Sequence, residues 1–394
     1  MNMKSLGILT AIVLLHLACS DRFLDDNPYR APQDLNDGLE AGTLEEVGID
    51  SQLVFKASAR IRKGRYGEVH SMLIYKDNRL VFEEYYKGHD YQWDAPKHYG
   101  DLVNWNATMP HYAHSVSKSI TSMCVGIAVD QGLIKDVHQS IFDYLPGYEY
   151  LQTEENKYIT IEHLLTGTSG LLWAEWSAPL SSMDNDQIAI WFHEKGPVDF
   201  VLSRPMIAPP GTYFTYSGGN IEILGVILEN ASGMPFEDFS RKYLFDPLGL
   251  DSAYWGIIYN TGEVHAAAGL LVTPREMVKI GATMLNNGFW HGKEILSGDW
   301  VTKSAYPYAG NVGINVPGED LKDMGYSYAW WTREIPYHGR TIHWFSANGW
   351  GGQKIIVLPE LDAVIVFTGA NYTSKVKQYA IFEDYLLPAL DQAR

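Results

Sequence analysis

Cysteine is nearly absent from this chain of 394 residues, which contains two. Cys19 follows an apolar stretch at the N-terminus, and Cys124 falls on the apolar face of a predicted helix. We therefore expect no disulfide, even in an oxidising compartment, and interpret Cys124 as a small core residue. Positive charge is also scarce, because 30 Lys and Arg face 47 Asp and Glu and give a formal net charge of −17. With no basic cluster, this balance argues against nucleic acid as a partner.

The sequence also lacks the G-x-S-x-G elbow that presents the serine of an α/β-hydrolase, so that fold is disfavoured. It contains no internal repeat and no low-complexity segment. Hydrophobic residues make up 46% of the chain and charged residues 20%, which is typical of a globular protein. A chain of this length holds one large domain or two interleaved ones.

The apolar run at the N-terminus, Leu6 to Ala18, is too short to span a bilayer and has the form of a secretory signal, with Lys4 before it. Its ending, Leu15 to Cys19, resembles a bacterial lipobox, in which the cysteine is lipidated and becomes the mature N-terminus. His16 departs from that pattern, which prefers an aliphatic residue there, and an ordinary signal peptide cut nearby is the alternative. In both cases we expect an exported protein of the bacterial periplasm or outer cell envelope. In the first case a lipid at Cys19 is its only link to a membrane.

Composition divides the chain into three parts. Residues 1–19 are the predicted signal peptide, and residues 20–46 are a polar stretch, broken by prolines and without periodicity, that suits a tether. The folded domain is predicted over residues 47–394, with a mainly helical insertion at about 135–290. Within that insertion, Thr160 begins a capped helix.

Strand patterns occur at both ends of the predicted domain. Residues 69–76 and 79–86 are rich in β-formers and flank Asp77-Asn78, which suits a two-residue hairpin turn, whereas residues 89–110 are expected to be irregular. Four further β-rich segments lie near the C-terminus, over 326–334, 341–350, 352–360 and 362–370, before a closing helix at 374–389. The pattern predicts an α+β fold, in which one antiparallel sheet forms from the N- and C-terminal parts, is flanked by helices and is interrupted by the helical insertion.

A serine and a lysine stand three apart at the start of the helix predicted after His111. Positions i and i+3 share one helix face, so the Lys118 amine can reach the Ser115 hydroxyl and form a nucleophile beside a base. The lysine must be neutral for this role, and its free pKa of about 10.4 has to be lowered by burial or by a neighbouring cation. S-x-x-K occurs by chance about once in a chain of this length, and a second match, Ser374 and Lys377, is interpreted as surface chemistry. A helix start with a solvated lysine is the alternative for Ser115.

Two later motifs accompany this pair. Tyr216 follows the break at Pro209 to Gly211, where a rigid loop can present a phenol; near a cationic lysine its phenolate is favoured, so it can relay a proton. An aromatic loop anchor is the alternative interpretation. The stretch from Ala347 to Gln353 is rich in glycine and precedes a buried strand, so its backbone can approach a ligand and offer half of an oxyanion hole. The alternative is a glycine-rich hairpin.

These three motifs, in this order, resemble those of the serine β-lactamase and penicillin-recognising enzyme superfamily, in particular its class C-like branch. Further similar segments extend the resemblance over roughly residues 65–390: KSITSMCVGIAVDQGLI, ITIEHLLTGTSGL, PPGTYFTYSGGN and GWGGQKIIVLPELDAVIVFTG. The resemblance implies an active site in the cleft between the sheet and the helical insertion. It also implies that Ser115 forms the acyl-enzyme, Lys118 is the base and Tyr216 shuttles the proton. The oxyanion hole is expected at the backbone N–H groups of Ser115 and Trp350.

Two positions depart from the pattern of β-lactamases and carboxypeptidases in this superfamily. Gly218 stands where those enzymes have asparagine, and Ala347 stands where they have the lysine or histidine that helps to bind a substrate carboxylate. The chain is instead similar to esterases and 6-aminohexanoate-dimer hydrolases of the superfamily. The predicted substrate-binding residues are Trp173, Ser217, Asn348 and Gly349, and the tryptophans and phenylalanine considered for an aromatic cleft are Trp173, Trp176, Trp350 and Phe345.

The leading hypothesis is a serine hydrolase that cleaves an ester or amide of a small molecule through acyl-Ser115. A β-lactamase or D-alanyl-D-alanine carboxypeptidase is the alternative within enzymes, and a catalytically inactive binding protein of the same fold is the lesser alternative. No cofactor or metal is expected. His111 and His114 form an H-x-x-H pattern, but no third ligand is suggested nearby, and we interpret them as loop and packing residues.

Overall fold

The structure is a computed structural model that describes residues 29–391. The predicted signal peptide and Cys19 lie outside these residues. One compact unit begins at Ala31 and contains all the elements described below.

The first two strands form the hairpin that the sequence predicts. Strand β1 (Val69–Lys76) is buried along its whole length, and β2 (Arg79–Tyr85) pairs with it antiparallel. Asp77 and Asn78 have φ values of 50° and 60°, as a two-residue turn with a left-handed backbone requires. The prediction for 69–86 is confirmed.

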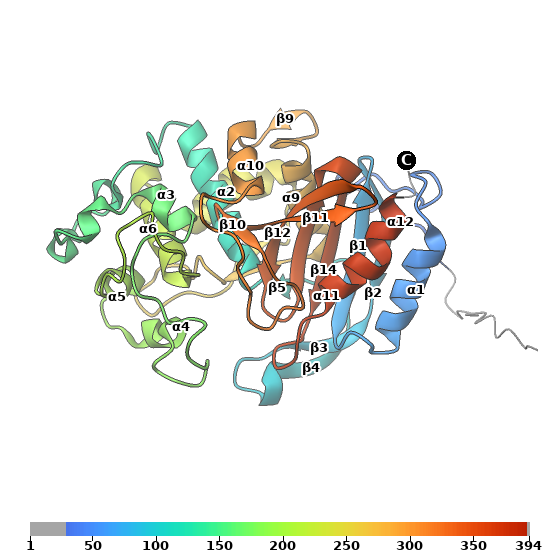
Figure 1. Cartoon of the computed structure of the whole chain (residues 1–394), viewed down its shortest axis with the longest axis horizontal. Helices are drawn as coiled ribbons and strands as arrows, with labels where there is room; N and C mark the ends of the chain where they lie inside the picture. The colour runs from blue at the N-terminus through green and yellow to red at the C-terminus, as the bar shows by residue number, and fades with distance from the viewer. Residues whose placement is uncertain (1–28, 392–394) are drawn as a thin grey trace, which may run out of the picture. The chain divides into compact units, whose positions relative to one another are not determined.

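The remaining strands of the main sheet come from the C-terminal part of the chain. They are β10 (Gly325–Ser327), β11 (Trp330–Tyr337), β12 (Arg340–Gly349), β13 (Gln353–Leu358) and β14 (Ala363–Gly369). The order in the sheet is β10-β11-β12-β13-β14-β1-β2, and β1 pairs antiparallel with β14. The two ends of the domain therefore share one seven-stranded antiparallel sheet, as predicted (Figure 1).

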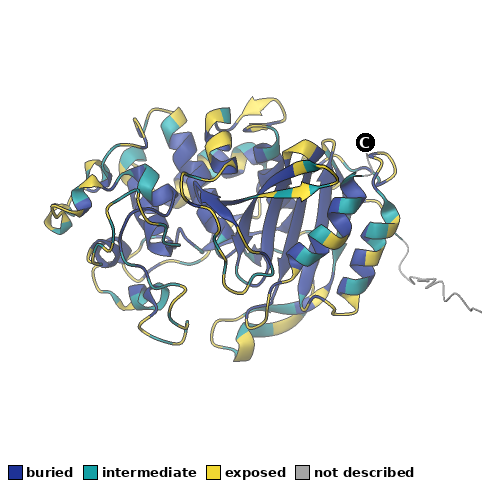
Figure 2. Cartoon of the chain, in the orientation of Figure 1, coloured by how far each residue is buried: buried dark blue, intermediate teal, exposed yellow. Residues whose placement is uncertain are grey.

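Helices cover both faces of this sheet. Helix α9 (Pro274–Leu285) lies on the face that contains Ile355, where a side chain at Gly281 would collide with the strands. The opposite face contains Ser346, which contacts Tyr379 near the C-terminus. The helices of this second group are α1 (Ser51–Arg62), α11 (Gln378–Ile381) and α12 (Leu387–Asp391), with one wider turn at Phe382–Leu386 between the last two. The strands between these layers are buried over most of their length (Figure 2).

The middle of the chain is mainly helical, as predicted. Helix α2 (Val116–Asp130) packs against both β12 and α6 (Gly218–Ser232), and α3 (Ile161–Leu165) begins with the predicted cap at Thr160. The other helices are α4 (Asp186–Ala189), α5 (Pro197–Leu202), α7 (Phe236–Ser240), α8 (Asp246–Leu248) and α10 (Gly298–Ala305). Among residues 29–391, no helix is both long and apolar enough to cross a membrane.

Small sheets appear where the sequence did not predict strands. Residues 89–110 were expected to be irregular, but β3 (Lys87–Tyr91) and β4 (Tyr99–Asn104) pair antiparallel. A three-stranded sheet joins β5 (His111–Tyr112) and β6 (Tyr254–Trp255) to β7 (Leu270–Val272). Strands this short show little alternation of polar and apolar residues, and several of them pair with strands far away in the sequence. The sequence pattern therefore did not predict them. A hairpin of β8 (Phe289–Trp290) and β9 (Lys293–Glu294) completes the set.

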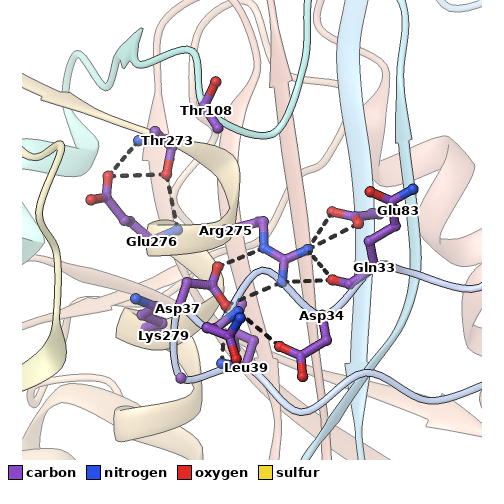
Figure 3. A network of polar contacts seen from close by, with 12 residues as sticks. Gln33, Asp34, Asp37, Leu39, Glu83, Thr108, Thr273, Arg275, Glu276 and Lys279 are labelled. Atoms are coloured by element: carbon purple, nitrogen blue, oxygen red, sulfur yellow. Dashed lines mark hydrogen bonds and ion pairs between the residues drawn. The ribbon is translucent and has the colours of Figure 1, made fainter.

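Part of the stretch predicted as a tether is packed on the domain. Leu39 and Leu44 are buried, and the backbone of residues 40–42 pairs with Leu80 at the edge of β2. Arg275, on α9, donates to the Asp37 carboxylate at 2.7 Å and to Glu83 at 2.9 Å, so this segment is joined to both α9 and β2 (Figure 3). The polar, proline-containing sequence of this segment did not predict these contacts, because the residues it packs against lie far away in the sequence.

Candidate active site

Ser115 stands at the junction between β5 and α2. Strand β5 pairs with β7, and the Ala113 N–H donates to the Leu270 carbonyl at 2.8 Å, which fixes the backbone just before the serine. His114 then adopts a left-handed conformation with φ of 48° and turns the chain into the helix. Ser115 is the residue that precedes α2, yet its side chain makes no capping hydrogen bond. Its hydroxyl is therefore available for other chemistry.

Lys118 lies one turn further along α2 and meets this hydroxyl. Its Nζ is 2.9 Å from Ser115 Oγ and donates to the Ala267 carbonyl at 3.2 Å. The side chain is 2% exposed, and burial lowers the pKa of the amine, while the carboxylates of Glu175 and Glu222 oppose that shift. The structure thus supplies the burial that a neutral, basic lysine requires.

Tyr216 closes the other side of the pair. Lys118 Nζ lies 5.1 Å from the centre of the tyrosine ring, and the ring stacks on Trp176 at 4.8 Å and on Trp331 at 5.6 Å. Burial raises the pKa of the Tyr216 hydroxyl, and a hydrogen bond with Ser115 only partly offsets this. Burial thus favours the phenol, which can donate a proton, over the phenolate that the sequence predicts beside a cationic lysine.

Two residues that line the cavity, Ser115 and Trp350, have backbone N–H groups without a protein acceptor among the described residues. Gly349 allows the backbone before Trp350 to lie close to the serine turn, because a Cβ at that position would collide with the Ala113 carbonyl. The side chain of Trp350 fixes the position of this residue, because its Nε1–H donates to the Tyr372 carbonyl at 3.0 Å. This arrangement has the donors of an oxyanion hole.

A buried carboxylate behind the lysine was missed by the sequence analysis. Glu222, on α6, accepts hydrogen bonds from the N–H groups of Ala266 and Ala267 at 3.0 and 3.1 Å and from His265 Nδ1 at 2.6 Å. It therefore fixes the loop whose Ala267 carbonyl receives Lys118. Only the tertiary structure joins these residues, since nothing in the local sequence around Glu222 marks it.

Glu222 lies outside the lining, whereas the other groups of the site line one cavity of about 820 Å³. Ser115, Lys118, Tyr216, Asn348 and Gly349 all contribute to its surface. Aromatic side chains form much of the remaining wall: Tyr91, Trp93, Tyr112, Trp176, Trp191, Phe192, Trp331, Trp350 and Tyr372. The structure therefore unites the predicted motifs in a largely aromatic cleft.

A family model described as Beta-lactamase matches residues 67–381, which is well over half of the chain. The chain belongs to the Beta-lactamase family. It is therefore a member of a serine hydrolase family, and the predicted α+β fold is the fold of that family.

The relatives that this Beta-lactamase family member resembles include both hydrolases and penicillin-binding proteins. A 6-aminohexanoate-dimer hydrolase of Paenarthrobacter ureafaciens is 26% identical over 65% of this chain and 65% of its own length. Penicillin-binding protein 4* of Bacillus subtilis is 23% identical over 63% of this chain and 57% of its own length. The chain thus spans less than two thirds of these relatives. The structure of a putative 6-aminohexanoate-dimer hydrolase from Bacillus anthracis, 20% identical, superposes with a TM-score of 0.66 over 92% of this chain and 87% of that one.

One departure from the family pattern has a steric explanation in this Beta-lactamase family member. A side chain at position 218 would collide with Gln187 and crowd Glu175. The Glu175 carboxylate accepts from the Gly218 N–H at 2.8 Å, and its other oxygen lies 4.0 Å from Lys118 Nζ. Glycine at this position thus makes room for a carboxylate beside the lysine.

The second departure leaves the cavity of this family member without the usual cation. Ala347 is fully buried, and Lys118 is the only lysine or arginine among the residues that line the cavity. Lys354, which is buried behind Asn348, forms an ion pair with Glu319.

Two predicted substrate-binding residues, Ser217 and Trp173, and one residue considered for the aromatic cleft, Phe345, are not among the residues that line the cavity. Ser217 does not line the cavity; its hydroxyl accepts from the Asn220 N–H and caps α6. Trp173 is buried outside the cavity lining, and its Nε1–H donates to Glu175. Trp176, and not Trp173, lines the cleft. Phe345 is packed against Trp330 in the core. Sequence spacing alone did not distinguish the side of each element that faces the cavity.

The histidines and the second S-x-x-K match also have defined positions. His111 is buried in the core, as expected of a packing residue. His114 also lines the cavity, so packing alone does not describe its position. Burial lowers the pKa of His114 to about 3, and the imidazole is neutral. Among residues 29–391, no group of histidine, cysteine or acidic side chains could hold a metal. Ser374 and Lys377 are exposed, and Ser374 is at the cavity edge.

Proposed function

We propose that the protein hydrolyses an ester or amide bond of a small molecule through an acyl-Ser115 intermediate. The observation that carries this proposal is the 2.9 Å contact between Lys118 Nζ and Ser115 Oγ in a buried site. Two free N–H groups and a phenol face the same cavity, so one carbonyl group can meet all of them.

Acylation begins with the neutral amine of Lys118 taking the proton of Ser115. The Ser115 oxygen then attacks the substrate carbonyl, and the N–H groups of Ser115 and Trp350 donate to the oxygen that becomes negative. Each such donor contributes about 3–4 kcal/mol to the stability of the transition state in comparable sites. The Tyr216 phenol gives its proton to the leaving alcohol or amine and regains one from Lys118, and the bond to the leaving group breaks.

Deacylation uses the same groups in reverse. A water molecule loses a proton to the Tyr216–Lys118 pair and attacks the acyl carbonyl, and the Ser115 oxygen leaves as a hydroxyl. The acid is released and the resting site is restored. The proton that the leaving group carries away in acylation is replaced by the proton taken from water in deacylation, so the three side chains end as they began.

The cavity favours this activity over the alternatives. A β-lactamase or D-alanyl-D-alanine carboxypeptidase binds a substrate carboxylate, but Ala347 replaces the usual cation, and Lys118 is the one lysine or arginine among the described residues that line this cavity. An inactive binding protein has no need for the intact contact between Ser115 and Lys118. The names of the relatives, among them a 6-aminohexanoate-dimer hydrolase, agree with an amide or ester substrate.

Covalent labelling tests the proposal. Intact-protein mass spectrometry after exposure to a fluorophosphonate should find one adduct, mapped to Ser115 and absent in Ser115→Ala and Lys118→Met. The protein should turn over p-nitrophenyl butyrate but not nitrocefin. Rapid nitrocefin turnover would favour the β-lactamase, and an adduct-free protein without turnover would favour the binding protein.

We further propose that the protein is exported and anchored by a lipid at Cys19. The support is the apolar run that ends in Leu15 to Cys19. In cells that express the full chain, the mature protein should begin at Cys19 and carry label from radioactive palmitate, and Cys19→Ser should lose the label. A mature N-terminus elsewhere would indicate an ordinary signal peptide.

A further inference from the structure

Two loops form one wall of the cavity. Residues 316–319 lead into β10, residues 371–376 follow β14, and the Val376 N–H donates to the Gly318 carbonyl at 2.8 Å, which ties the loops together. Glu319 is the one charged residue that these two loops contribute to the cavity lining.

The Glu319 carboxylate is only partly satisfied. Its side chain is 8% exposed; one oxygen pairs with Lys354, whereas Oε2 has no hydrogen-bond partner among the described residues. Asn348 lines the cavity nearby, since it is the cross-strand neighbour of Lys354. Its Oδ1 accepts from Tyr379 at 2.7 Å, but its Nδ2 is likewise unpartnered in the part of the chain that the structure describes. Buried polar atoms are costly when they lack partners, so these two atoms, on residues that line the cavity, are open to hydrogen bonds from a bound molecule.

The charge around Lys354 is unbalanced. The charge of Lys354 acts on Glu319, with which it is paired, and on the next residue, Asp320, which does not line the cavity and whose Oδ1 lacks a partner within residues 29–391. Burial raises the pKa of both carboxyl groups, and Lys354 opposes the shift. Lys375, which also acts on Asp320, is exposed to solvent and is screened by it. The one charged side chain that these two loops present to the cavity is therefore acidic, and one of its oxygens is without a partner among the described residues.

We propose that Glu319 forms a subsite for an ammonium group of the substrate. An ammonium has three donors and no acceptor, so it satisfies the free carboxylate oxygen and complements the charge of the wall. Asn348 Nδ2 then donates to a neutral oxygen of the same molecule. A substrate carboxylate is excluded, because Glu319 repels it and the lining offers no free cation. This proposal rests on the ester or amide hydrolysis proposed above and names the substrates that the site prefers.

The test measures binding without catalysis. The Ser115→Ala protein is titrated by calorimetry at pH 7 with hexylamine, 1-hexanol and hexanoate, which share one carbon chain and differ in charge. Hexylamine should bind about ten-fold more tightly than 1-hexanol, and hexanoate should bind most weakly. Equal binding of hexylamine and 1-hexanol, or tighter binding of 1-hexanol, would overturn the proposal in favour of a neutral subsite.

Substitutions assign the preference to one carboxylate. In Glu319→Gln the advantage of hexylamine should fall about ten-fold while 1-hexanol binds as before. Because that change leaves Lys354 buried without its partner, Glu319→Gln/Lys354→Met is the second variant, and thermal melting checks its fold. Glu360→Gln removes an exposed carboxylate and should change neither ligand. An unchanged preference in the double variant, or a preference lost only in Glu175→Gln, would overturn the assignment to Glu319. A failure of the proposed hydrolysis would appear separately, as the absence of a fluorophosphonate adduct.

Discussion

The two buried lysines beside the cavity, Lys118 on α2 and Lys354 on β13, differ in their partners. Lys354 is ion-paired with Glu319, whereas Lys118 donates to a hydroxyl and a carbonyl and keeps Glu175 at 4.0 Å. Burial is nearly complete for both side chains. Burial without a bonded carboxylate lowers the pKa of Lys118 and makes the amine a base. The comparison teaches that two lysines buried to the same degree can have different partners, a carboxylate for Lys354 and a hydroxyl and a carbonyl for Lys118.

The largest expected effect comes from removing the base. Lys118→Met should lower kcat/KM by about 10⁴-fold, because Ser115 then has no group to take its proton. The fold should persist, since a buried charge is replaced by an apolar chain of similar length. Steady-state ester hydrolysis and circular dichroism measure the two effects. A variant that kept a tenth of the activity would contradict the role of Lys118.

The matching change at the other lysine should affect stability instead. Lys354→Met leaves the Glu319 carboxylate buried without its cation and should lower the free energy of unfolding by about 3–5 kcal/mol. Denaturant unfolding checks this, and the double variant with Glu319→Gln should recover most of the loss. If Lys354→Met abolished hydrolysis in a protein that remained folded, the contrast between the two lysines would fail.

The oxyanion donors depend on the close contact of β12 with the serine turn. Gly349→Ala should push the strand away from the Ala113 carbonyl and move the Trp350 N–H, with a loss of roughly 10²-fold in kcat. KM should change little, because the donor acts mainly in the transition state. An unchanged kcat would show that the Trp350 N–H is not an oxyanion donor.

The smallest effect concerns the carboxylate that faces the base. The negative charge of Glu175 raises the pKa of Lys118, so Glu175→Gln should lower it further. Since the neutral amine is the active form, kcat/KM rises with pH through this pKa, and the rise should move to lower pH. The pH profile of Glu360→Gln, measured alongside, should match that of the unsubstituted protein. A shift toward higher pH would contradict the assignment of this limb to Lys118.

Local patterns predicted the features that local physics determines. The turn at Asp77-Asn78, the strands from Tyr326 to Ala370 and the reach of Lys118 to Ser115 follow from backbone preference and periodicity alone. The Tyr216 loop was also expected near the pair. The burial of its ring, which stacks on Trp176 and Trp331, is supplied by the fold and raises the pKa of the Tyr216 hydroxyl, an effect that the sequence did not reveal.

The features that were missed depend on pairs distant in sequence. Glu222 is significant only because the loop at Ala266 and Ala267 folds back on it, and Glu319 only because β13 brings Lys354 to it. Asp37 likewise needs Arg275 to become part of the domain. No spacing rule joins such residues, since each contact requires the sheet to be formed first.

The pairing of β1 with β14 has a consequence for the order in which the molecule forms. Val69 and its partner Gly369 are almost at opposite ends of the domain, so the β1 edge remains open until the last strand has been made. An open edge binds other strands, and a chain that crosses a membrane before folding is exposed to this hazard throughout the passage. A polypeptide truncated before Ala363 should therefore aggregate, even though it contains every group of the reaction.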